Sequence, residues 1–441
     1  MKMNASYDFV SSPVKTISGE ISVPGDKSIS HRAIILGSIA KGTTSIQNFL
    51  QGEDCLATLQ AFRSMGIEIE GPFNQQVVIH GKGKFGLNAP KQVIDCGNSG
   101  TSMRLLAGLL AAQSFSSILT GDESLLRRPM ERVSRPLTQM GADISTEHGK
   151  PPITINGKQE LKGIHYVMPE ASAQVKSCLL LAGMYAKDET TVTEPGFTRD
   201  HTERMLTTFS YPIQKCGHHI TINSESECIA TDIIVPGDIS SAAFFIVAAT
   251  LIPGSEVLIR NVGINPTRTG IIQILSQMGA SIEQSNKRLF GEELVADLYI
   301  RHAPLEGIDI PVELVPLAID EFPVIFIAAA CASGQTRLHG AKELRSKESD
   351  RIGAMVEGLI QLGVTAQAFE DGVFIKGGKL QGGEIKSYGD HRIAMAFAIA
   401  GAAAKEQIVI KDCKNVATSF PDFVKTAQAL QLNIQEVHND A

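Results

Sequence analysis

The feature of this sequence that most constrains its fold is an internal repeat: one pattern recurs about every 70 residues along the chain. Each copy begins with small polar residues and continues into an apolar helix rich in Ala and Leu. A turn, a short strand and an amphipathic helix ending near Gly-Ala or Gly-Val follow, and an alternating β-hairpin closes the copy. The six copies begin at Asp26, Asn98, Ser172, Asp238, Asp320 and Asp390.

The first helix of each copy predicts a core built around helices. Residues 242–251, for example, are apolar on nearly all sides, which is typical of a fully buried helix. The second helix carries one apolar stripe, as in residues 352–360, and is expected to cover a surface. We therefore predict an α/β fold of two domains, each with three repeated helix-plus-sheet units around three buried parallel helices.

The copies divide as three and three, with a break near residues 235–238. Periodicity alone leaves open which half the first 24 residues join. Parallel buried helices present their N-termini on one face, where free N–H groups and a partial positive charge favour anions. Polar residues open every copy, so we expect the functional residues on these faces.

Composition narrows the classes of partner. The formal net charge of −7 excludes a global basic field for nucleic acid or a membrane surface, and the absence of Trp disfavours base stacking. The seven Cys are scattered, without CxxC or metal-ligand spacing to His, as in a reduced cytoplasmic protein without a metal site. We see no signal peptide, and the apolar runs are too short to span a bilayer.

Cations gather at the openings of the copies and in the loops between them. Any one of them alone would be interpreted as a solvated charge. Together, in an acidic protein, they indicate a substrate with several phosphate and carboxylate groups. These cations are Lys27, Arg32, Arg104, Arg128, Lys176, Arg199, Lys347, Arg351 and Arg392.

Acids occupy the same openings: Asp26, Asp238, Asp320, Glu321, Glu348, Asp350 and Asp390. Several are expected to be helix N-caps, Asp238 and Asp390 most clearly. Asp320 and Glu348 are better candidates for proton transfer, because cations or a helix opening beside them can hold each one ionised and in place. The run from Lys347 to Ile352, which reads as the opening of a helix, combines these features in one segment.

Six segments in order along the chain form a specific combination. They are residues 24–32 (PGDKSISHR), 97–104 (GNSGTSMR), 127–129 (RRP), 172–177 (SAQVKS), 344–351 (LRSKESDR) and 389–395 (GDHRIAM). With these segments the chain resembles the 5-enolpyruvylshikimate-3-phosphate synthase (3-phosphoshikimate 1-carboxyvinyltransferase) family.

The resemblance implies the enolpyruvyl transferase fold, with one domain of residues 25–237 and another of residues 1–24 plus 238–441. It implies transfer of the enolpyruvyl group of phosphoenolpyruvate to the 5-hydroxyl of shikimate 3-phosphate, with release of phosphate. The expected route is addition–elimination in an interdomain cleft, within chorismate and aromatic amino-acid biosynthesis. It implies no metal or cofactor and neither a nucleic-acid nor a membrane partner, and we expect a cytoplasmic monomer.

The resemblance also implies roles for individual residues. Lys27 would touch both substrates, Asp320 would take the hydroxyl proton, and Glu348 would deliver a proton to C3 of phosphoenolpyruvate. Shikimate 3-phosphate would be held by Ser28, Arg32, Ser172, Gln174, Arg199 and Lys347. Phosphoenolpyruvate and the departing phosphate would be held by Asn98, Gly100, Arg128, Arg351 and Arg392.

Two features depart from many members of the family. Thr418 stands where many members have a Lys, and residues 199–203 (RDHTE) replace a stretch bearing Ser or Tyr. In both features the chain resembles the second class of the family. Gly100 resembles the form sensitive to glyphosate, so we expect glyphosate to compete with phosphoenolpyruvate.

The alternative is the sister enolpyruvyl transferase that acts on UDP-N-acetylglucosamine. That family typically has Lys-Asn near its start and often a Cys in a mobile loop. Here Ser28 follows Lys27, and residues 113–135 contain no Cys.

Overall fold

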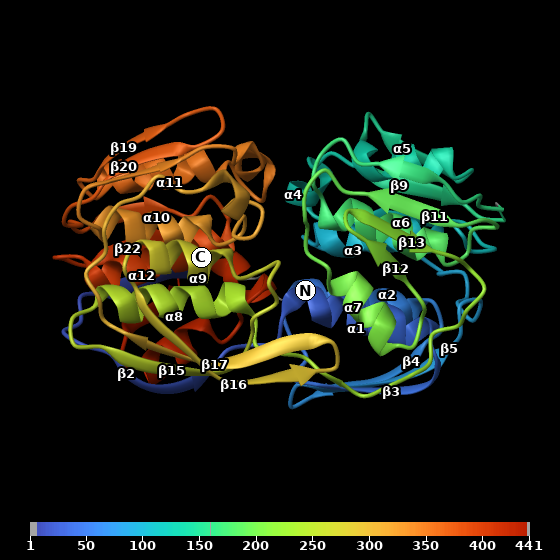
Figure 1. Ribbon diagram of the computed structural model, residues 1–441, viewed down its shortest axis with the longest axis horizontal. Helices are drawn as coiled ribbons and strands as arrows, with labels where there is room; N and C mark the ends of the chain where they lie inside the picture. The colour runs from blue at the N-terminus through green and yellow to red at the C-terminus, as the bar shows by residue number, and fades with distance from the viewer. Residues whose placement is uncertain (1–6, 159, 439–441) are drawn as a thin grey trace. The chain divides into compact units, whose positions relative to one another are not determined.

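The computed structural model describes residues 7–158 and 160–438. Within them the chain forms two compact units (Figure 1). Unit 1 contains residues 7–24, 236–288 and 294–438, and unit 2 contains the remaining described residues, including the short segment 289–293. The expected domain boundary at residue 237 lies two residues beyond the end of the main segment of unit 2 at Val235. The ends of the expected ranges, residues 1–6 and 439–441, lie outside the described residues.

Unit 2 is built around three buried helices that contact one another. They are α1 (Lys27–Ile39), α3 (Gly100–Leu110) and α6 (Ala173–Gly183). Their N-caps are Asp26, Ser99 and Ser172, and each cap side chain accepts a hydrogen bond from a backbone N–H of the first turn. Thr101 and Gln174, at the starts of α3 and α6, are hydrogen-bonded to each other, so these helices begin at the same end of the unit.

Three sheets surround these helices, and they share one topology. In each, an edge strand runs parallel to its neighbour and a hairpin completes the sheet antiparallel. In spatial order the strands are β14 (Ile233–Ile234), β3 (Lys41–Gln47), β5 (Gln76–Lys82), β4 (Glu68–Phe73); β6 (Ile94–Asp95), β7 (Ser117–Thr120), β9 (Lys150–Asn156), β8 (Asp143–Glu147); and β10 (His165–Val167), β11 (Thr190–Thr193), β13 (His219–Ile222), β12 (Gln214–Cys216). The remaining helices are α2 (Glu53–Ser64), α4 (Glu123–Leu126), α5 (Glu131–Gln139) and α7 (His201–Thr208).

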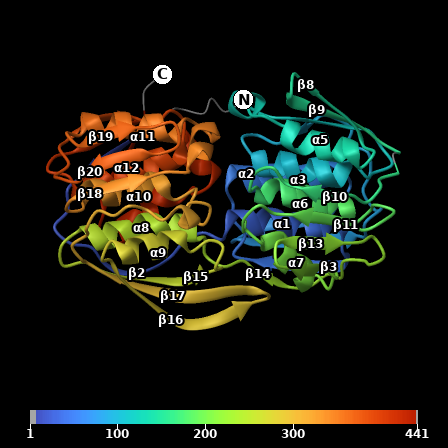
Figure 2. The ribbon, with the colours of Figure 1, turned by 45° about the horizontal axis from the view of Figure 1, so that its top comes forward.

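Unit 1 repeats the plan around α8 (Ile239–Leu251), α10 (Phe322–Cys331) and α12 (His391–Ala403), as Figure 2 shows. Asp238 and Asp390 are the N-caps of α8 and α12, which confirms that prediction. The other helices are α9 (Gly270–Gln277), α11 (Arg351–Gln361), α13 (Phe423–Ala429), η1 (Val312–Leu314), η2 (Lys342–Ser346) and η3 (Lys414–Thr418). In spatial order the strands are β16 (Ser281–Phe290), β17 (Glu293–Arg301), β15 (Glu256–Gly263), β2 (Ser18–Ser22); β18 (Gln335–Leu338), β20 (Val373–Lys376), β19 (Thr365–Ala368); and β21 (Gly383–Lys386), β22 (Ile408–Lys411), β1 (Tyr7–Ser12), β23 (Asn433–His438).

The two N-terminal strands complete unit 1. Strand β1 lies antiparallel between β22 and β23, in the place that β5, β9 and β13 take in the sheets of unit 2. Strand β2 lies parallel to β15 as the edge strand of another sheet. The last repeat therefore takes one hairpin strand from the opposite end of the chain, which periodicity along the sequence cannot reveal.

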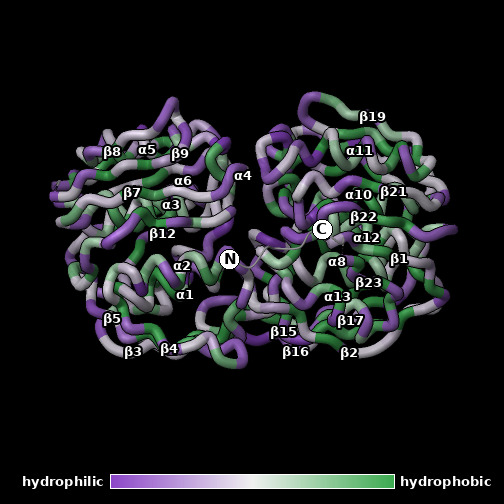
Figure 3. The backbone as a smooth tube through the Cα atoms, turned by 180° about the vertical axis from the view of Figure 1, so that it is seen from behind, coloured by the Kyte–Doolittle hydropathy of each residue, from purple (hydrophilic) through white to green (hydrophobic). Residues whose placement is uncertain are grey.

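Each unit has its own hydrophobic core. In Figure 3 hydrophobic segments lie inside each unit and hydrophilic ones follow many of its outer loops. The outer helices end in a recurring way: Gly66, Gly141, Gly279 and Gly363 follow the C-caps with positive φ, which glycine adopts most easily. In the third and sixth copies Ser210 and Gln431 take that position, at φ 58° and 68°. The structure confirms the predicted α/β class and its repeated helix-plus-sheet units.

Candidate active site

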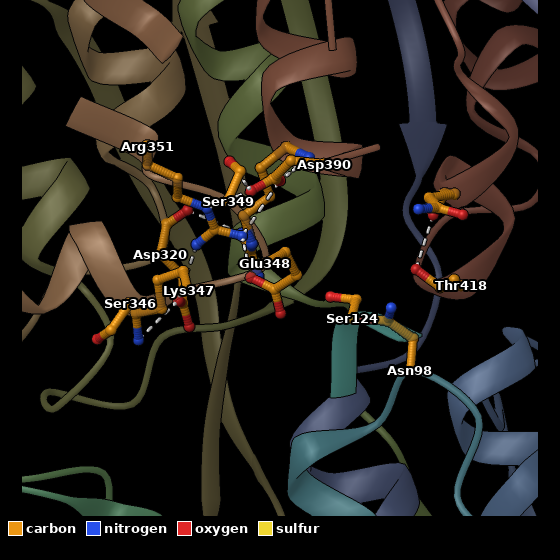
Figure 4. A network of polar contacts seen from close by, with 12 residues as sticks. Asn98, Ser124, Asp320, Ser346, Lys347, Glu348, Ser349, Arg351, Asp390 and Thr418 are labelled. Carbon is orange, nitrogen blue, oxygen red and sulfur yellow. Dashed lines mark hydrogen bonds and ion pairs between the residues drawn. The ribbon is translucent and has the colours of Figure 1, made fainter. Parts of the chain in front are cut away.

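In unit 1, Arg351 joins the acids that the sequence indicated for proton transfer (Figure 4). Helix α11 begins at Arg351, with Asp350 as its N-cap, so Lys347 and Glu348 precede the helix. The Arg351 side chain is 1% exposed; its Nη2 lies 2.7 Å from Glu348 Oε2, and its Nη1 lies 3.4 Å from Asp320 Oδ1. One buried guanidinium therefore contacts both candidate carboxylates.

Asp390 is a third carboxylate that pairs with Arg351, and unlike the other two it is fully buried. Its Oδ2 lies 2.9 Å from Arg351 Nε, and it also accepts a hydrogen bond from Ser349 Oγ at 3.0 Å. Burial opposes the charge of Arg351, but the carboxylates of Asp390, Glu348 and Asp320 outweigh burial and raise its pKa. Burial likewise opposes ionisation of Asp390, but the charge of Arg351 lowers its pKa on balance. Both groups are therefore charged at neutral pH.

Asp320 and Glu348 keep an accessible edge. Their side chains are 16% and 21% exposed, in contrast to the buried Arg351 and Asp390. Lys347 Nζ lies 3.5 Å from Asp320 Oδ1 and 2.7 Å from Glu343 Oε1. Two carboxylates that share the cation Arg351 and remain accessible can accept and deliver protons at a bound substrate.

Arg392 lies at the start of α12. Its Nη1 donates to the main-chain oxygen of Asp320 at 3.0 Å and lies 3.8 Å from Glu321 Oε1. Its side chain is 12% exposed. Unit 1 thus brings together Asp320, Lys347, Glu348, Arg351 and Arg392 at the helix starts.

In unit 2, the predicted residues Asn98, Gly100 and Arg128 lie together. Arg128 Nη2 donates to Asn98 Oδ1 at 2.7 Å and to Ser124 Oγ at 3.3 Å, and Asn98 Nδ2 donates to Asp122 Oδ2 at 2.7 Å. A methyl group added at Gly100 would lie 3.2 Å from Arg128 Nη1. Gly100 therefore leaves the guanidinium room beside the first turn of α3, where backbone N–H groups favour an anion.

The start of α1 carries the other predicted cations of unit 2. Lys27 Nζ forms an ion pair with Asp54 of α2. Arg32 is buried; its Nε donates to Thr202 Oγ1 and its Nη2 donates to Ser177 Oγ, both at 2.7 Å. Burial lowers the pKa of Arg32 to about 10, so it remains a cation at neutral pH.

His31 lies inside the junction of α1, α2 and α3. Its Nδ1 is 2.8 Å from Thr58 Oγ1 and its Nε2 is 3.5 Å from Ser99 Oγ. Burial, followed by the charges of Lys27 and Arg32, lowers its pKa well below the usual value, so the ring is neutral. His31 therefore joins three helices rather than binding an anion.

The remaining predicted residues of unit 2 lie at the starts of α1 and α6 and before α7. Ser172 is the N-cap of α6 and accepts from Val175 N at 3.4 Å, and Gln174 Oε1 accepts a hydrogen bond from Arg104. Arg199 directly precedes the N-cap residue of α7. The main-chain oxygen of Ser28 accepts a hydrogen bond from Arg32 Nη1 at 3.0 Å. All four side chains are partly exposed at most.

Lys176 has a different environment from the one expected of a cation that binds substrate. Its side chain is fully buried, with Nζ 2.8 Å from Glu194 Oε1 and 2.6 Å from Glu203 Oε1. The interpretation of Lys176 as an anion-binding cation is wrong, because two buried carboxylates already neutralise it. Its place one turn inside α6 gave no local signal of this burial.

Sequence reasoning also missed several partners of the predicted residues. Asp54 pairs with Lys27, Asp122 with Asn98, and Arg268 with Asp238. None of them belongs to a motif, and each lies far along the chain from its partner or in an outer loop. Thr418, in place of the Lys common in the family, is 5% exposed and donates to Asn415 O at 2.7 Å. In the described part of the chain no group of three or more His, Cys, Asp or Glu could hold a metal ion.

Comparison with known proteins agrees with this architecture of repeated units. The solved EPSP synthase from Acinetobacter baumannii superposes with a TM-score of 0.89 at 53% identity, covering 98% of this chain and all of that one. The family model for EPSP synthase (3-phosphoshikimate 1-carboxyvinyltransferase) matches residues 11–427, and the chain belongs to this family.

Named relatives are similar along nearly their full length. The 3-phosphoshikimate 1-carboxyvinyltransferase of Legionella pneumophila (strain Corby) is 68% identical over 97% of this chain and 99% of its own. That of Methylococcus capsulatus is 59% identical over 97% of this chain and 98% of its own. These matches do not favour the sister transferase that acts on UDP-N-acetylglucosamine. No helix among the described residues is long and apolar enough to cross a membrane.

Proposed function

We propose that this protein transfers the enolpyruvyl group of phosphoenolpyruvate to the 5-hydroxyl of shikimate 3-phosphate and releases phosphate. The observation that carries the proposal is the contact of Arg351 with both Asp320 and Glu348. The family to which the chain belongs supplies the reaction class. In the cell this step serves chorismate and aromatic amino-acid biosynthesis, and we expect a cytoplasmic monomer.

The proposed reaction has two steps. In the addition, Glu348 delivers a proton to C3 of phosphoenolpyruvate while Asp320 takes the proton of the 5-hydroxyl, whose oxygen bonds to C2. In the elimination, the Glu348 carboxylate takes a proton back from C3, the double bond between C2 and C3 forms again, and the C2–O bond to phosphate breaks; the proton that Asp320 took leaves with the phosphate. Lys27 contacts both substrates, and its charge offsets the charge that develops on phosphate.

The binding roles follow the clusters of cations. Asn98, Gly100 and Arg128 of unit 2, with Arg351 and Arg392 of unit 1, hold phosphoenolpyruvate and phosphate. Ser28, Arg32, Ser172, Gln174, Arg199, Asp320 and Lys347 hold shikimate 3-phosphate. Arg guanidinium groups suit these ligands because their N–H groups match carboxylate and phosphate oxygens.

The reaction needs residues of both units on the same pair of substrates, so the proposal includes closure of the units when ligands bind. Closure excludes water and strengthens the action of the cations on the developing phosphate. Small-angle scattering should show a smaller radius of gyration with both ligands, and an unchanged radius would contradict closure.

Phosphate release tests the reaction directly. We expect release with phosphoenolpyruvate plus shikimate 3-phosphate and none with UDP-N-acetylglucosamine as the acceptor. Asp320→Ala should lower turnover by several orders of magnitude. The matched control Asp309→Ala removes an acid of the same unit whose side chain is 78% exposed, and it should keep turnover. Release only with the nucleotide sugar would overturn the acceptor assignment.

A further inference from the structure

A buried polar network lies behind Asp320 and Arg392 in unit 1 and joins the starts of its three central helices. Ser240 of α8 donates from Oγ to Glu321 Oε1, and Arg268 Nη2 donates to Ser240 Oγ at 2.7 Å. Arg268 Nη2 also lies 3.2 Å from Asp238 Oδ1, the N-cap of α8. Glu321 is 1% exposed, and Ser240 and Arg268 are each 3% exposed.

The Glu321 carboxylate lies between two cations, Arg268 and Arg392, which differ in how deeply they are buried. Its Oε1 is 3.9 Å from Arg268 Nη2 and 3.8 Å from Arg392 Nη1. Arg268 is buried against Asp238 and Ser240, whereas Arg392 keeps 12% of its side chain exposed. Arg268 is therefore held in place inside the unit, whereas part of the Arg392 side chain remains accessible to an anion.

The second carboxylate oxygen of Glu321 has no hydrogen bond within the described part of the chain to offset its burial, so the charge of Glu321 depends more on Arg268 and Arg392. Oε2 is buried and has no hydrogen-bond donor among residues 7–158 and 160–438. A buried carboxylate with an unfilled oxygen is costly unless nearby cations compensate its charge. Arg392, 3.8 Å away, is thus one of the two cations that compensate the Glu321 charge, and its Nη1 also donates to the main-chain oxygen of the neighbouring Asp320.

We propose that Glu321 is a positioning residue that acts through Arg392 and sets the affinity for phosphoenolpyruvate. The inference rests on the proposed function, in which Arg392 holds phosphoenolpyruvate and the departing phosphate. The anchored chain from Asp238 through Arg268 and Ser240 fixes the carboxylate, and the carboxylate fixes the guanidinium. Arg392 then meets the anion in one orientation, without the entropic cost of ordering a free side chain.

Glu321→Gln tests the inference because it keeps the shape of the side chain and removes its charge. We expect the KM for phosphoenolpyruvate to rise about ten- to a hundredfold, the loss typical of a binding group that is slightly misplaced. The KM for shikimate 3-phosphate should change less than twofold, and kcat should fall less than the KM for phosphoenolpyruvate rises. In an Arg392→Lys background, Glu321→Gln should have no further effect on that KM.

Asp297→Asn is the matched control. Asp297 is a 3% exposed acid of the same unit, and its Oδ2 lies 2.9 Å from Arg260 Nη1, away from the network. The control should lower the melting temperature and leave the KM for phosphoenolpyruvate unchanged. If Glu321→Gln does not fold, Ser240→Ala keeps the Glu321 charge and removes the donor to Oε1 together with the acceptor of Arg268 Nη2, and a smaller rise in the same KM is expected.

The outcomes separate the two proposals. An inactive wild-type protein would overturn the proposed function and this inference with it. An active wild type with equal rises in both KM values, or with an effect that persists beside Arg392→Lys, would overturn this inference alone. An unchanged KM for phosphoenolpyruvate in Ser240→Ala, where Glu321→Gln does not fold, would also overturn it.

Discussion

Replacing Gly100 with Ala is a small perturbation that the structure makes informative. The added methyl carbon would lie 2.8 Å from Arg104 Nη1 and 3.2 Å from Arg128 Nη1. Ordinary van der Waals contact begins at 3.4 Å, so the Arg104 guanidinium must move by about 0.6 Å and that of Arg128 by about 0.2 Å. Both atoms are the ends of flexible side chains, so the fold should survive.

The cost falls on hydrogen bonds that hold the two arginines. Arg128 Nη2 is held by Asn98 at 2.7 Å, and Arg104 is held by Gln174. A hydrogen bond to a charged group is worth about 1.5–3 kcal/mol, and a shift of a few tenths of an ångström forfeits part of it. A loss of about 1–2 kcal/mol corresponds to a rise of about 5- to 30-fold in a binding constant.

Steady-state phosphate release at varied phosphoenolpyruvate measures this effect. We expect Gly100→Ala to raise the KM for phosphoenolpyruvate about tenfold, within the range from the hydrogen-bond estimate. The inhibition constant of glyphosate should rise by at least as much, because we expect glyphosate to compete for the same place. Gly378→Ala is the control, since a methyl group there meets nothing within 4 Å. Unchanged constants, or a larger rise in the KM for shikimate 3-phosphate, would refute the reasoning.

Three further predictions concern stability, each measured by urea unfolding. Lys176→Met leaves two carboxylates buried without their cation and should lower the free energy of unfolding by about 3–5 kcal/mol. The control is Lys215→Met, at a side chain that is 39% exposed, and it should change the free energy of unfolding by less than about 0.5 kcal/mol. The lowered pKa of His31 means that the unfolded chain binds the proton more strongly, so its contribution is fully present above about pH 6.5 and is lost as pH falls, by up to about 1.4 kcal/mol per unit. Comparing the pH slope of His31→Asn with that of wild type isolates this term, and equal slopes would contradict it. Gln431→Gly relieves a positive φ of 68° and should stabilise by about 1 kcal/mol; a loss of stability would show that the side chain has a packing role.

Much of the fold could be predicted because its signals are local. The apolar helices, the amphipathic helices that end at Gly66 or Gly141, and the caps at Asp238 and Asp390 depend on residues within a few turns of one another. The position of Asp320, Glu348 and Arg351 at helix starts follows from the same periodicity. Their roles in catalysis remain predictions, but the structure shows that these three side chains meet.

The tertiary structure alone decided which residues face one another across long stretches of sequence. Strand β1 completes a sheet with β22 and β23, which lie at the other end of the chain. The spacing of residue types along the sequence does not show this pairing, because backbone hydrogen bonds between strands do not depend on it. Lys176 looks like other cations at the helix starts, yet two distant glutamates bury and neutralise it. Glu321 is an ordinary acid beside Asp320 until Ser240, Arg268 and Arg392 surround it. The periodicity of the sequence therefore determined the helices and their ends. What each side chain can do depends on its burial and its charged partners, and only the three-dimensional structure decides these.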